Sequence, residues 1–290
     1  MKAALSNSFV AANIPIATPS SLMIPREPFS TLPAKKNILV DVNRNNPIKI
    51  LVNTHGHEDH FIYNYLFSKA QLWVHEADAP TFRDMDKLID CYDPTPAERN
   101  RWQKFIAESC HYEARDPDRL IEDGDELTFG NTRCRVIHTP GHTPGHCAFH
   151  FPEERVLFTA DLDLVKAGPY YGDINSSIED TLDSLERLTH VDADVYLASH
   201  GRGIYEGDPE HIRRYATMIY DREEKLLEFL AGGPKTLEDI TAHGIIYGPP
   251  RILAGWDLSI SERAMMKKHL EWLKKKKMVY SEKKYFYLAP

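Results

Sequence analysis

The sequence lacks the features of several large protein classes. It has only four cysteines, and none of them forms a C-x-x-C pair: Cys91, Cys110, Cys134 and Cys147. Disulfide-stapled secreted domains and cysteine-rich zinc modules are therefore excluded, and we expect reduced thiols. No segment approaches the ~18 apolar residues of a membrane helix, and polar residues 6–8 interrupt the N-terminal stretch where a signal peptide needs an apolar one. We expect a cytoplasmic protein without membrane contact.

Positive charge is also scarce outside the C-terminal part of the chain. The 290 residues carry a formal net charge of −8 and are 42% hydrophobic. Residues 208–290 contain 15 basic and 12 acidic side chains, a charge of +3, which leaves −11 for the first 207 residues. A protein that coats nucleic acid along its whole surface is not expected from this balance. The length leaves room for one large domain or two smaller ones.

The densest chemistry lies in residues 53–60, N-T-H-G-H-E-D-H. The preceding residues 48–52 are apolar and β-branched and predict a buried strand, whereas residues 61–69 predict a helix. The cluster is therefore expected on a strand-to-helix turn. There, His55 and His57 can converge on one cation, and Asp59 and His60 can reach a second.

Further polar groups are expected where other strands end. The predicted strands cover residues 37–42, 71–75, 127–129, 132–138, 147–151, 156–159 and 194–198, with a turn at 43–47 and an amphipathic helix at 176–188. Three strand ends carry metal-binding residue types: His142 in the loop T-P-G-H-T-P-G-H, Asp161 and His200. Strands that end in such groups and alternate with helices predict a layered α/β body.

These motifs resemble the dinuclear hydrolases of the metallo-β-lactamase superfamily. The resemblance covers residues 37–201 and includes seven ligand positions in the family's order: His55, His57, Asp59, His60, His142, Asp161 and His200. It implies an αββα sandwich with two divalent metals at one edge, with zinc as first choice and iron or manganese compatible. It also implies that His55, His57 and His142 hold metal 1, that Asp59, His60 and His200 hold metal 2, and that Asp161 bridges them. The implied chemistry is hydrolysis by a metal-bridging hydroxide, with Asp59 and Asp161 holding the nucleophile.

The resemblance extends to residues around the metals. A glutamate would replace His57 in flavodiiron oxidoreductases, and true β-lactamases of this fold generally lack the aspartate found here as Asp161. Residues 165–172 resemble the loop that contacts glutathione in hydroxyacylglutathione hydrolases, but Pro169 stands where those enzymes have a lysine, which argues against glutathione thioesters. Tyr170 and Tyr171 are expected to contact substrate, and Tyr171 to assist catalysis, with plain aromatic packing as the alternative.

Other polar residues receive supporting roles. The resemblance places Asp41, at the end of the strand predicted over residues 37–42, behind the metals. We expect structural or surface roles for the histidines outside the ligand set, with His146 placed to orient a ligand: His75, His138, His146, His190 and His211.

Two segments flank or interrupt this body. Residues 1–36 are rich in proline, serine and alanine and predict an irregular arm within a catalytic domain of residues 1–207. Residues 78–119 predict two helices separated by Pro94 and Pro96, either a lid over the site or a hairpin packed outside it.

Residues 208–290 are predicted to be mainly helical. Helices are predicted over residues 212–230, after the cap Thr236 and from Ser261 to Lys277, followed by a hairpin over 278–288, which together resemble a winged-helix module. Such a body and tail resemble the lactamase-β-2-like subgroup, whose members include an RNA endonuclease and thioesterases. The run 274–277, four lysines near Trp272, Tyr280 and Tyr285, is either a phosphate-tracking surface or an ordinary helix face, a pocket wall or a homodimer contact.

The sequence therefore predicts a dinuclear metal hydrolase that cleaves an ester or thioester of a small acyl substrate. An endoribonuclease that holds RNA with its basic C-terminal domain is one alternative. A mononuclear-iron sulfur dioxygenase is another, because the ligands of metal 1 are shared with that class.

Overall fold

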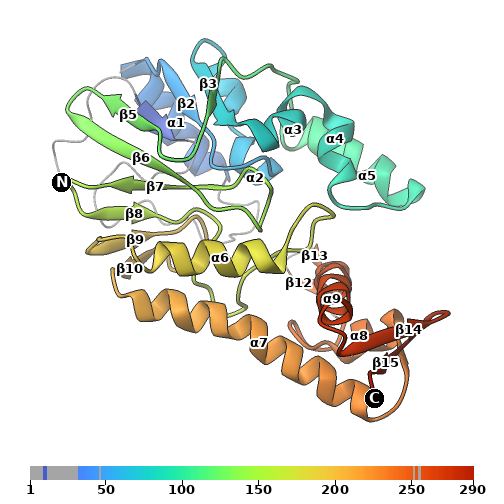
Figure 1. Ribbon diagram of the computed structural model, residues 1–290. Helices are drawn as coiled ribbons and strands as arrows, with labels where there is room; N and C mark the ends of the chain where they lie inside the picture. Colours follow the sequence, from blue (N-terminus) through green and yellow to red (C-terminus); the bar gives the residue numbers. More distant parts are fainter. Residues whose placement is uncertain (1–8, 12–31, 46, 251, 254–255) are drawn as a thin grey trace.

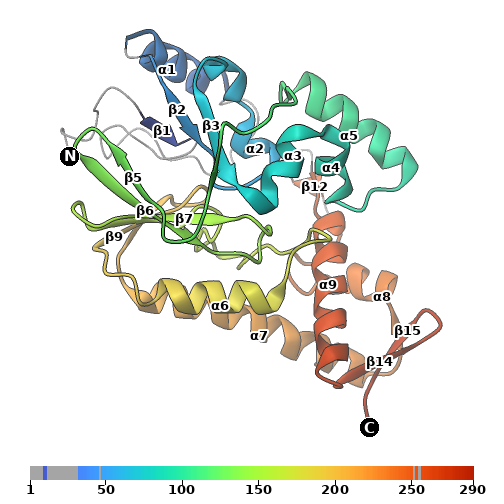
Figure 2. The ribbon, with the colours of Figure 1, turned by 45° about the horizontal axis from the view of Figure 1, so that its top comes forward.

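The body consists of two β-sheets packed face to face with helices on both outer faces (Figures 1 and 2). The computed structural model describes residues 9–11, 32–45, 47–250, 252–253 and 256–290. The first sheet is parallel, in the order β1 (Phe9–Ala11), β2 (Ile50–Val52), β3 (Gln71–His75) and β4 (Arg119–Ile121). This layered arrangement confirms the expected αββα sandwich.

The second sheet is mixed and has the order β10-β9-β8-β7-β6-β5. Its strands are β5 (Glu126–Phe129), β6 (Thr132–His138), β7 (Cys147–Phe151), β8 (Val156–Phe158), β9 (Val195–Leu197) and β10 (Ile204–Glu206). All neighbours are antiparallel except β8 and β9. Because β2 and the parallel pair β8 and β9 end at the same edge of the sandwich, their following loops can meet there.

Three apolar clusters hold these layers together. Val52 and Ile121 of the first sheet pack against Val136 and Phe149 of the second, between the sheets. Leu185, on α6 (Ile178–Leu188), and Tyr196 lie in the cluster under the outer face of the second sheet. The third cluster lies outside the first sheet, among the helices described next.

The first helical segment corrects the sequence prediction. Residues 37–42 were expected as a strand, but they lie within α1 (Leu32–Asn45). Leu39 and Val42, one helical turn apart, both pack on the cluster outside the first sheet, so the apolar spacing serves a helix. The outer neighbour of β2 in the sheet is β1, from the segment predicted to be an irregular arm. Residues 1–8 and 12–31 of that predicted arm lie outside the described residues.

The same correction removes Asp41 from the neighbourhood of the metals. Its side chain is exposed on α1 and forms an ion pair with Arg44 at 3.2 Å.

The helix expected over residues 61–69 is replaced by two short ones, α2 (Glu58–Phe61) and the 3-10 helix η2 (Asn64–Phe67).

Residues 78–119 form helices on the outside of the first sheet (Figure 2). They comprise α3 (Ala79–Arg83), α4 (Met85–Asp90) and α5 (Pro96–Glu108), which follow the 3-10 helix η3 (Glu76–Asp78). Leu88 and Ile106 are fully buried against the outer cluster, as a packed hairpin requires. The turn between α4 and α5 nevertheless reaches the site through Tyr92, whose ring stacks on that of His57 with centroids 5.9 Å apart.

The C-terminal part begins with the long helix α7, which belongs to two cores. Ile212 and Tyr215, in the first half of α7 (Pro209–Ala231), pack against the second sheet, whereas Leu226 and Leu230 lie in a separate C-terminal cluster. The remaining elements are β11 (Lys235–Thr236), α8 (Leu237–His243), β12 (Ile252–Leu253), β13 (Trp256–Asp257), α9 (Leu258–Lys275), β14 (Val279–Glu282) and β15 (Tyr285–Leu288). The three helices and terminal hairpin match the expected order, and the winged-helix assignment stays a prediction.

Two smaller expectations can be compared with the structure. Thr236 caps α8 as expected, but α9 begins at Leu258 behind the cap Asp257 rather than at Ser261. All four cysteines are free thiols. Among the described residues, no helix combines the length and apolar character needed to cross a bilayer.

Candidate metal centre

We call residues 53–60 the first histidine loop and residues 139–146 the second. Hydrogen bonds of Asn53 join the first loop to β3 and to its own backbone. Asn53 continues the pairing of β2 by donating its N–H to Trp73 O at 3.0 Å, and its side-chain amide donates to His60 O at 2.8 Å. The chain therefore turns sharply between strand and helix, with the histidine side chains directed to one side. Gly145 of the second histidine loop lies against Asp78, where a Cβ would be only 2.6 Å from Asp78 Cγ, so the position requires glycine.

Three imidazoles converge in what we call the first group: His55, His57 and His142. His57 Nδ1 lies 3.1 Å from His55 Nε2 and 3.0 Å from His142 Nε2, and the last two atoms are 3.2 Å apart. All three side chains are buried. Tetrahedral zinc with Zn–N bonds of about 2.0–2.1 Å holds its nitrogens about 3.3 Å apart, so the triangle has the size of a zinc site.

The outer ring nitrogens fix which atoms face the centre of this triangle. His57 Nε2 donates to Asp173 Oδ2 at 2.6 Å, and His142 Nδ1 donates to the carbonyl oxygen of Tyr170 at 2.9 Å. Because each outer nitrogen carries the proton in its hydrogen bond, the inner nitrogen is the one that can offer a lone pair to a cation. The donor set of the first group therefore fits a bound divalent metal.

A second group lies beside the first and consists of Asp59, His60 and His200. Asp59 Oδ2 is 3.4 Å from His200 Nε2, and Asp59 Oδ1 is 3.6 Å from His60 Nε2. Both histidines are buried, whereas the Asp59 side chain is 52% exposed. The second group thus forms the side of the site that solvent reaches.

Asp161 connects the two groups. Its Oδ1 lies 3.0 Å from His60 Nε2, and its Oδ2 lies 3.1 Å from His200 Nε2 and 3.5 Å from His142 Nε2. Ala160, immediately before it, is fully buried with φ of 50°, a conformation that costs a non-glycine residue about 1–2 kcal/mol. The strain at Ala160 is retained where the chain turns the Asp161 carboxylate into the site.

The pKa values in the site reflect burial and mutual charge. Burial, reinforced by the charge of His57, lowers the pKa of His142 to about 4. Burial acts the same way on His57, but the charge and hydrogen bond of Asp173 outweigh it and raise the pKa of His57 to about 10, so a cation that binds at Nδ1 must displace a proton there. Burial would raise the pKa of Asp161, yet the surrounding histidines hold it well below its usual range. Asp161 is therefore a carboxylate at neutral pH, as a ligand must be.

Three supporting residues complete the site, and sequence reasoning identified only one of them. His146 Nε2 accepts the backbone N–H of Asp161 at 3.1 Å, in line with its expected orienting role. Asp78 accepts hydrogen bonds from Gly56 N–H and Gly145 N–H, one in each histidine loop. Asp173 orients His57 as described above. No spacing rule marks Asp78 or Asp173, because each reaches its partners across more than 20 residues of sequence.

The two tyrosines expected to contact substrate occupy different surroundings. Tyr170 is half-buried, and its ring centroid lies 5.8 Å from that of His142. Tyr171 is fully buried, and its hydroxyl lies between Arg222 Nη1 at 2.6 Å and His269 Nε2 at 2.8 Å. This position differs from the expected contact with substrate, because Tyr171 presents no surface to the site.

The other histidines lie outside both groups. His75 stacks on His138 with ring centroids 4.0 Å apart, and exposed His190 pairs with Glu186. His211 lines a cavity of about 170 Å³ with Lys166 and Arg214, near the loop that follows His200. These positions agree with structural or surface roles.

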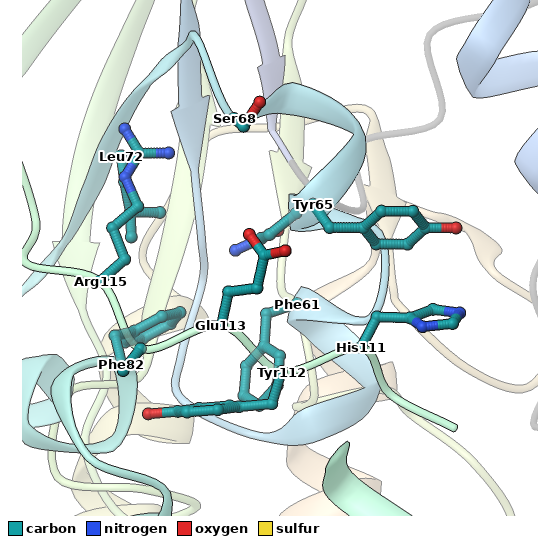
Figure 3. Close-up of a pocket in the computed structure, with 11 residues that line it drawn as sticks. Phe61, Tyr65, Ser68, Leu72, Phe82, His111, Tyr112, Glu113 and Arg115 are labelled. Carbon is teal, nitrogen blue, oxygen red and sulfur yellow. The ribbon is translucent and has the colours of Figure 1, made fainter. Parts of the chain in front are cut away.

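A second cavity, also of about 170 Å³, lies beside α2 and η2 (Figure 3). Phe61, Tyr65 and Tyr112 give it aromatic walls, and the Glu113 carboxylate projects across it. None of the seven candidate ligands lines either cavity. The reactive centre is therefore separate from both hollows.

Comparisons with known proteins agree with this geometry. A family model described as the metallo-beta-lactamase superfamily matches residues 41–200. Human acyl-coenzyme A thioesterase MBLAC2 is 27% identical over 146 residues, which are 49% of this chain and 50% of that protein. Hydroxyacylglutathione hydrolase of Francisella philomiragia is 34% identical over 82 residues, which are 27% of this chain and 31% of that protein. The chain thus spans half or less of the length of these curated relatives.

Solved structures show the same fold over more of the chain. A metallo-beta-lactamase family protein from Thermus thermophilus matches with a TM-score of 0.66 and 25% identity, over 83% of this chain and 80% of that one. A beta-lactamase domain protein from Burkholderia ambifaria has the same TM-score of 0.66 with 19% identity, over 88% of this chain and 80% of that one.

The fold is an αββα sandwich whose linked histidine–aspartate groups have the donor atoms to hold metal. The chain belongs to the metallo-beta-lactamase superfamily, and the curated relatives that it matches are hydrolases by name.

Proposed function

We propose that this protein is a dinuclear metal-dependent hydrolase that cleaves an ester or thioester of a small acyl substrate. The observation that carries the proposal is the position of Asp161, whose two carboxylate oxygens reach histidines of both groups. His55, His57 and His142 would hold one cation and Asp59, His60 and His200 the other, with Asp161 shared. When bound, two divalent cations lower the pKa of water toward neutrality and polarise the carbonyl oxygen under attack.

The side chains around the metals would divide the remaining work. Asp59, the half-exposed ligand, lies where water enters and would orient it by accepting a hydrogen bond. Asp161, which is buried and ionised, would offset part of the cationic charge. Tyr170, beside His142, is the residue we propose to contact substrate.

The substrate class is supported by the relatives and by one local difference. Both curated relatives named above act on thioesters of an acyl group, by their printed names. Pro169 stands in the loop before Tyr170, at the position where the resemblance to glutathione-thioester hydrolases implies a lysine. We therefore place acyl thioesters of carriers other than glutathione, together with simple esters, first among the substrates to test.

The contacts of the lysine run favour this proposal over RNA cleavage. Lys275 forms an ion pair with Glu179 of α6, and Lys276 lies 3.0 Å from the buried carboxylate of Glu223. Lys274 donates to Ser281 at 3.0 Å. Three of the four lysines are thus engaged in contacts within the chain, which supports a packing role for the run.

The test is a paired assay on a preparation whose metal content has been measured. Acyl-coenzyme A, S-lactoylglutathione and p-nitrophenyl acyl esters would be assayed beside a single-stranded RNA and a low-molecular-weight persulfide with oxygen-uptake recording. Each assay would include Asp59→Ala and, as a matched control, Asp183→Ala, an exposed carboxylate on α6. We expect about two metals per chain and turnover of an ester or thioester that Asp59→Ala abolishes and Asp183→Ala retains.

Two other outcomes would replace the proposal. RNA cleavage that depends on Asp59 would make the protein a nuclease. One iron per chain with oxygen uptake on the persulfide would make it a sulfur dioxygenase.

A further inference from the structure

The loop that follows Asp161 has two sides, and one of them holds the first group. The Tyr170 carbonyl accepts the hydrogen bond of His142 Nδ1, and Asp173 accepts that of His57 Nε2. Ser176 Oγ adds a bond to the backbone carbonyl of His142 at 2.7 Å. Residues 167–176, which we call the strap, therefore set the orientation of two of the three histidines in the first group.

The other side of the strap is held by the C-terminal helices. Arg222 of α7, which is buried, donates from Nη1 to Pro169 O at 2.7 Å and to Tyr171 Oη at 2.6 Å, and from Nη2 to Ala167 O. From α9, Met265 Sδ accepts the backbone N–H of Tyr171 at 3.1 Å. Lys268 Nζ donates to Ile174 O at 2.7 Å and Ser176 O at 3.0 Å.

The contacts of the C-terminal helices hold the strap on both sides of the Tyr170 carbonyl. Pro169 O and Tyr171 N–H, on either side of the Tyr170 carbonyl, are both held from the C-terminal helices. The carbonyl between them cannot turn away from His142 unless one of these bonds breaks. The Arg222 side chain also fills the space beside Gly168, where a Cβ would lie 2.5 Å from Nη2. A single buried guanidinium thus fixes the strap at three acceptors.

We propose that Arg222 is a positioning residue for the first group, acting through the strap on His57 and His142. The C-terminal helices are then part of the scaffold of the metal centre. This inference rests on the proposed function, because it takes the first group to be a cation site. The contacts described between residues 167–176 and the histidines of the site are those with His57 and His142, so we expect Arg222 to act on the first group.

Single-site backgrounds make this selectivity measurable. Asp59→Ala leaves the first group as the complete zinc site, and His57→Ala leaves the second. Arg222→Met would be introduced into each background, and zinc affinity would be measured by competition with a chromophoric chelator. Arg213→Met is the matched control, because Arg213 lies on the same helix but is exposed and forms an ion pair with Glu210.

We expect Arg222→Met to weaken zinc binding about 10- to 100-fold in the Asp59→Ala background, the usual effect of losing a residue that orients ligands. Binding in the His57→Ala background should change less than about threefold. Arg222→Lys, which keeps one cationic donor, should recover part of the loss. Thermal unfolding of each metal-free variant would establish that it is folded.

Equal weakening in both backgrounds would show that Arg222 merely stabilises the fold, and no weakening in either would also overturn the inference. If the Asp59→Ala parent itself bound no zinc while Arg222 was intact, the proposed function would fail first. The two failures are thus distinguished by the parent measurement.

Discussion

Asp78 offers the sharpest test of how the site is built. It is buried, and its carboxylate accepts the N–H of Gly56 at 2.9 Å, the N–H of Gly145 at 2.7 Å and the hydroxyl of Thr143 at 2.6 Å. Gly56 lies between His55 and His57, and the other two residues follow His142. Asp78→Ala would therefore release the two loops that supply the first group.

The expected loss of stability follows from these three bonds. Each buried donor left without its partner costs about 1–3 kcal/mol. The Thr143 hydroxyl can rotate toward another acceptor, but the two peptide N–H groups cannot, so their loss gives about 2–6 kcal/mol. Burial raises the pKa of Asp78, so removal of the carboxylate also relieves a desolvation cost. We expect a net loss of about 3 kcal/mol, in the lower half of that range.

Urea denaturation of the metal-free protein would measure this change, and zinc content after dialysis would measure the consequence for the site. Asp86→Ala is the control, because Asp86 lies nearby in α4 but is exposed and pairs with Arg99. Its loss should cost less than about 1 kcal/mol. A loss below 1 kcal/mol for Asp78→Ala, with zinc retained, would refute the reasoning that Asp78 ties the histidine loops together.

Three further predictions address pH, metal and substrate. Burial, with the charges of Arg222 and Lys276, lowers the pKa of His269 to about 3, below its value of about 6.5 in the unfolded chain. The contribution of neutral His269 to the stability of the fold is therefore complete above pH 6.5 and is lost as the pH falls toward 3. In this range His269 alone changes the free energy of unfolding by up to about 1.4 kcal/mol per pH unit. Urea denaturation at pH 7.5 and 5.5 should therefore show a smaller change in the free energy of unfolding for His269→Gln, and an unchanged difference would contradict the assignment. Removal of metal with a chelator should lower the melting temperature by several degrees, and zinc should restore it, because histidine nitrogens 3.0–3.2 Å apart then lack a shared cation. A melting temperature unaffected by the chelator would argue against a metal site. Tyr170→Ala should raise KM at unchanged zinc content if Tyr170 contacts substrate, whereas loss of zinc would assign it to the scaffold.

The gathering of the seven candidate ligands could be predicted from the sequence because each one lies just beyond the end of a strand. Asp161 follows β8, His200 follows β9, and the first histidine loop follows β2. In a layered fold these ends meet at one edge, so local pattern and topology together place the side chains. Asp78 and Asp173 had no such signal. Each is a single aspartate in a loop, and its role depends on contacts that only the folded chain creates.

The errors in the fold have a similar cause. The segment N-I-L-V-D-V at residues 37–42 contains three β-branched residues, yet it forms part of α1, because Leu39 and Val42 find their apolar partners on one helical face. Packing thus overrides local propensity. Tyr171 was expected at the site because residues 165–172 resemble the loop that contacts glutathione in hydroxyacylglutathione hydrolases. The Tyr170 ring lies beside His142, whereas the Tyr171 hydroxyl contacts Arg222 and His269.

Contacts outside the histidine motifs link distant parts of the chain beside the first group. Ile174 N–H donates to Cys91 O at 2.8 Å, and Lys267 Nζ lies 3.0 Å from Asp93, so the turn before α5 meets both the strap and α9. Three segments that lie outside the histidine motifs therefore meet beside the first group. Since cavities and specificity in such sandwiches depend on loops, changes in these segments can alter substrate choice while the ligands stay fixed. The same contacts predict that replacing Lys267 with methionine should affect KM before it affects zinc binding, because Lys267 contacts the turn and not the strap.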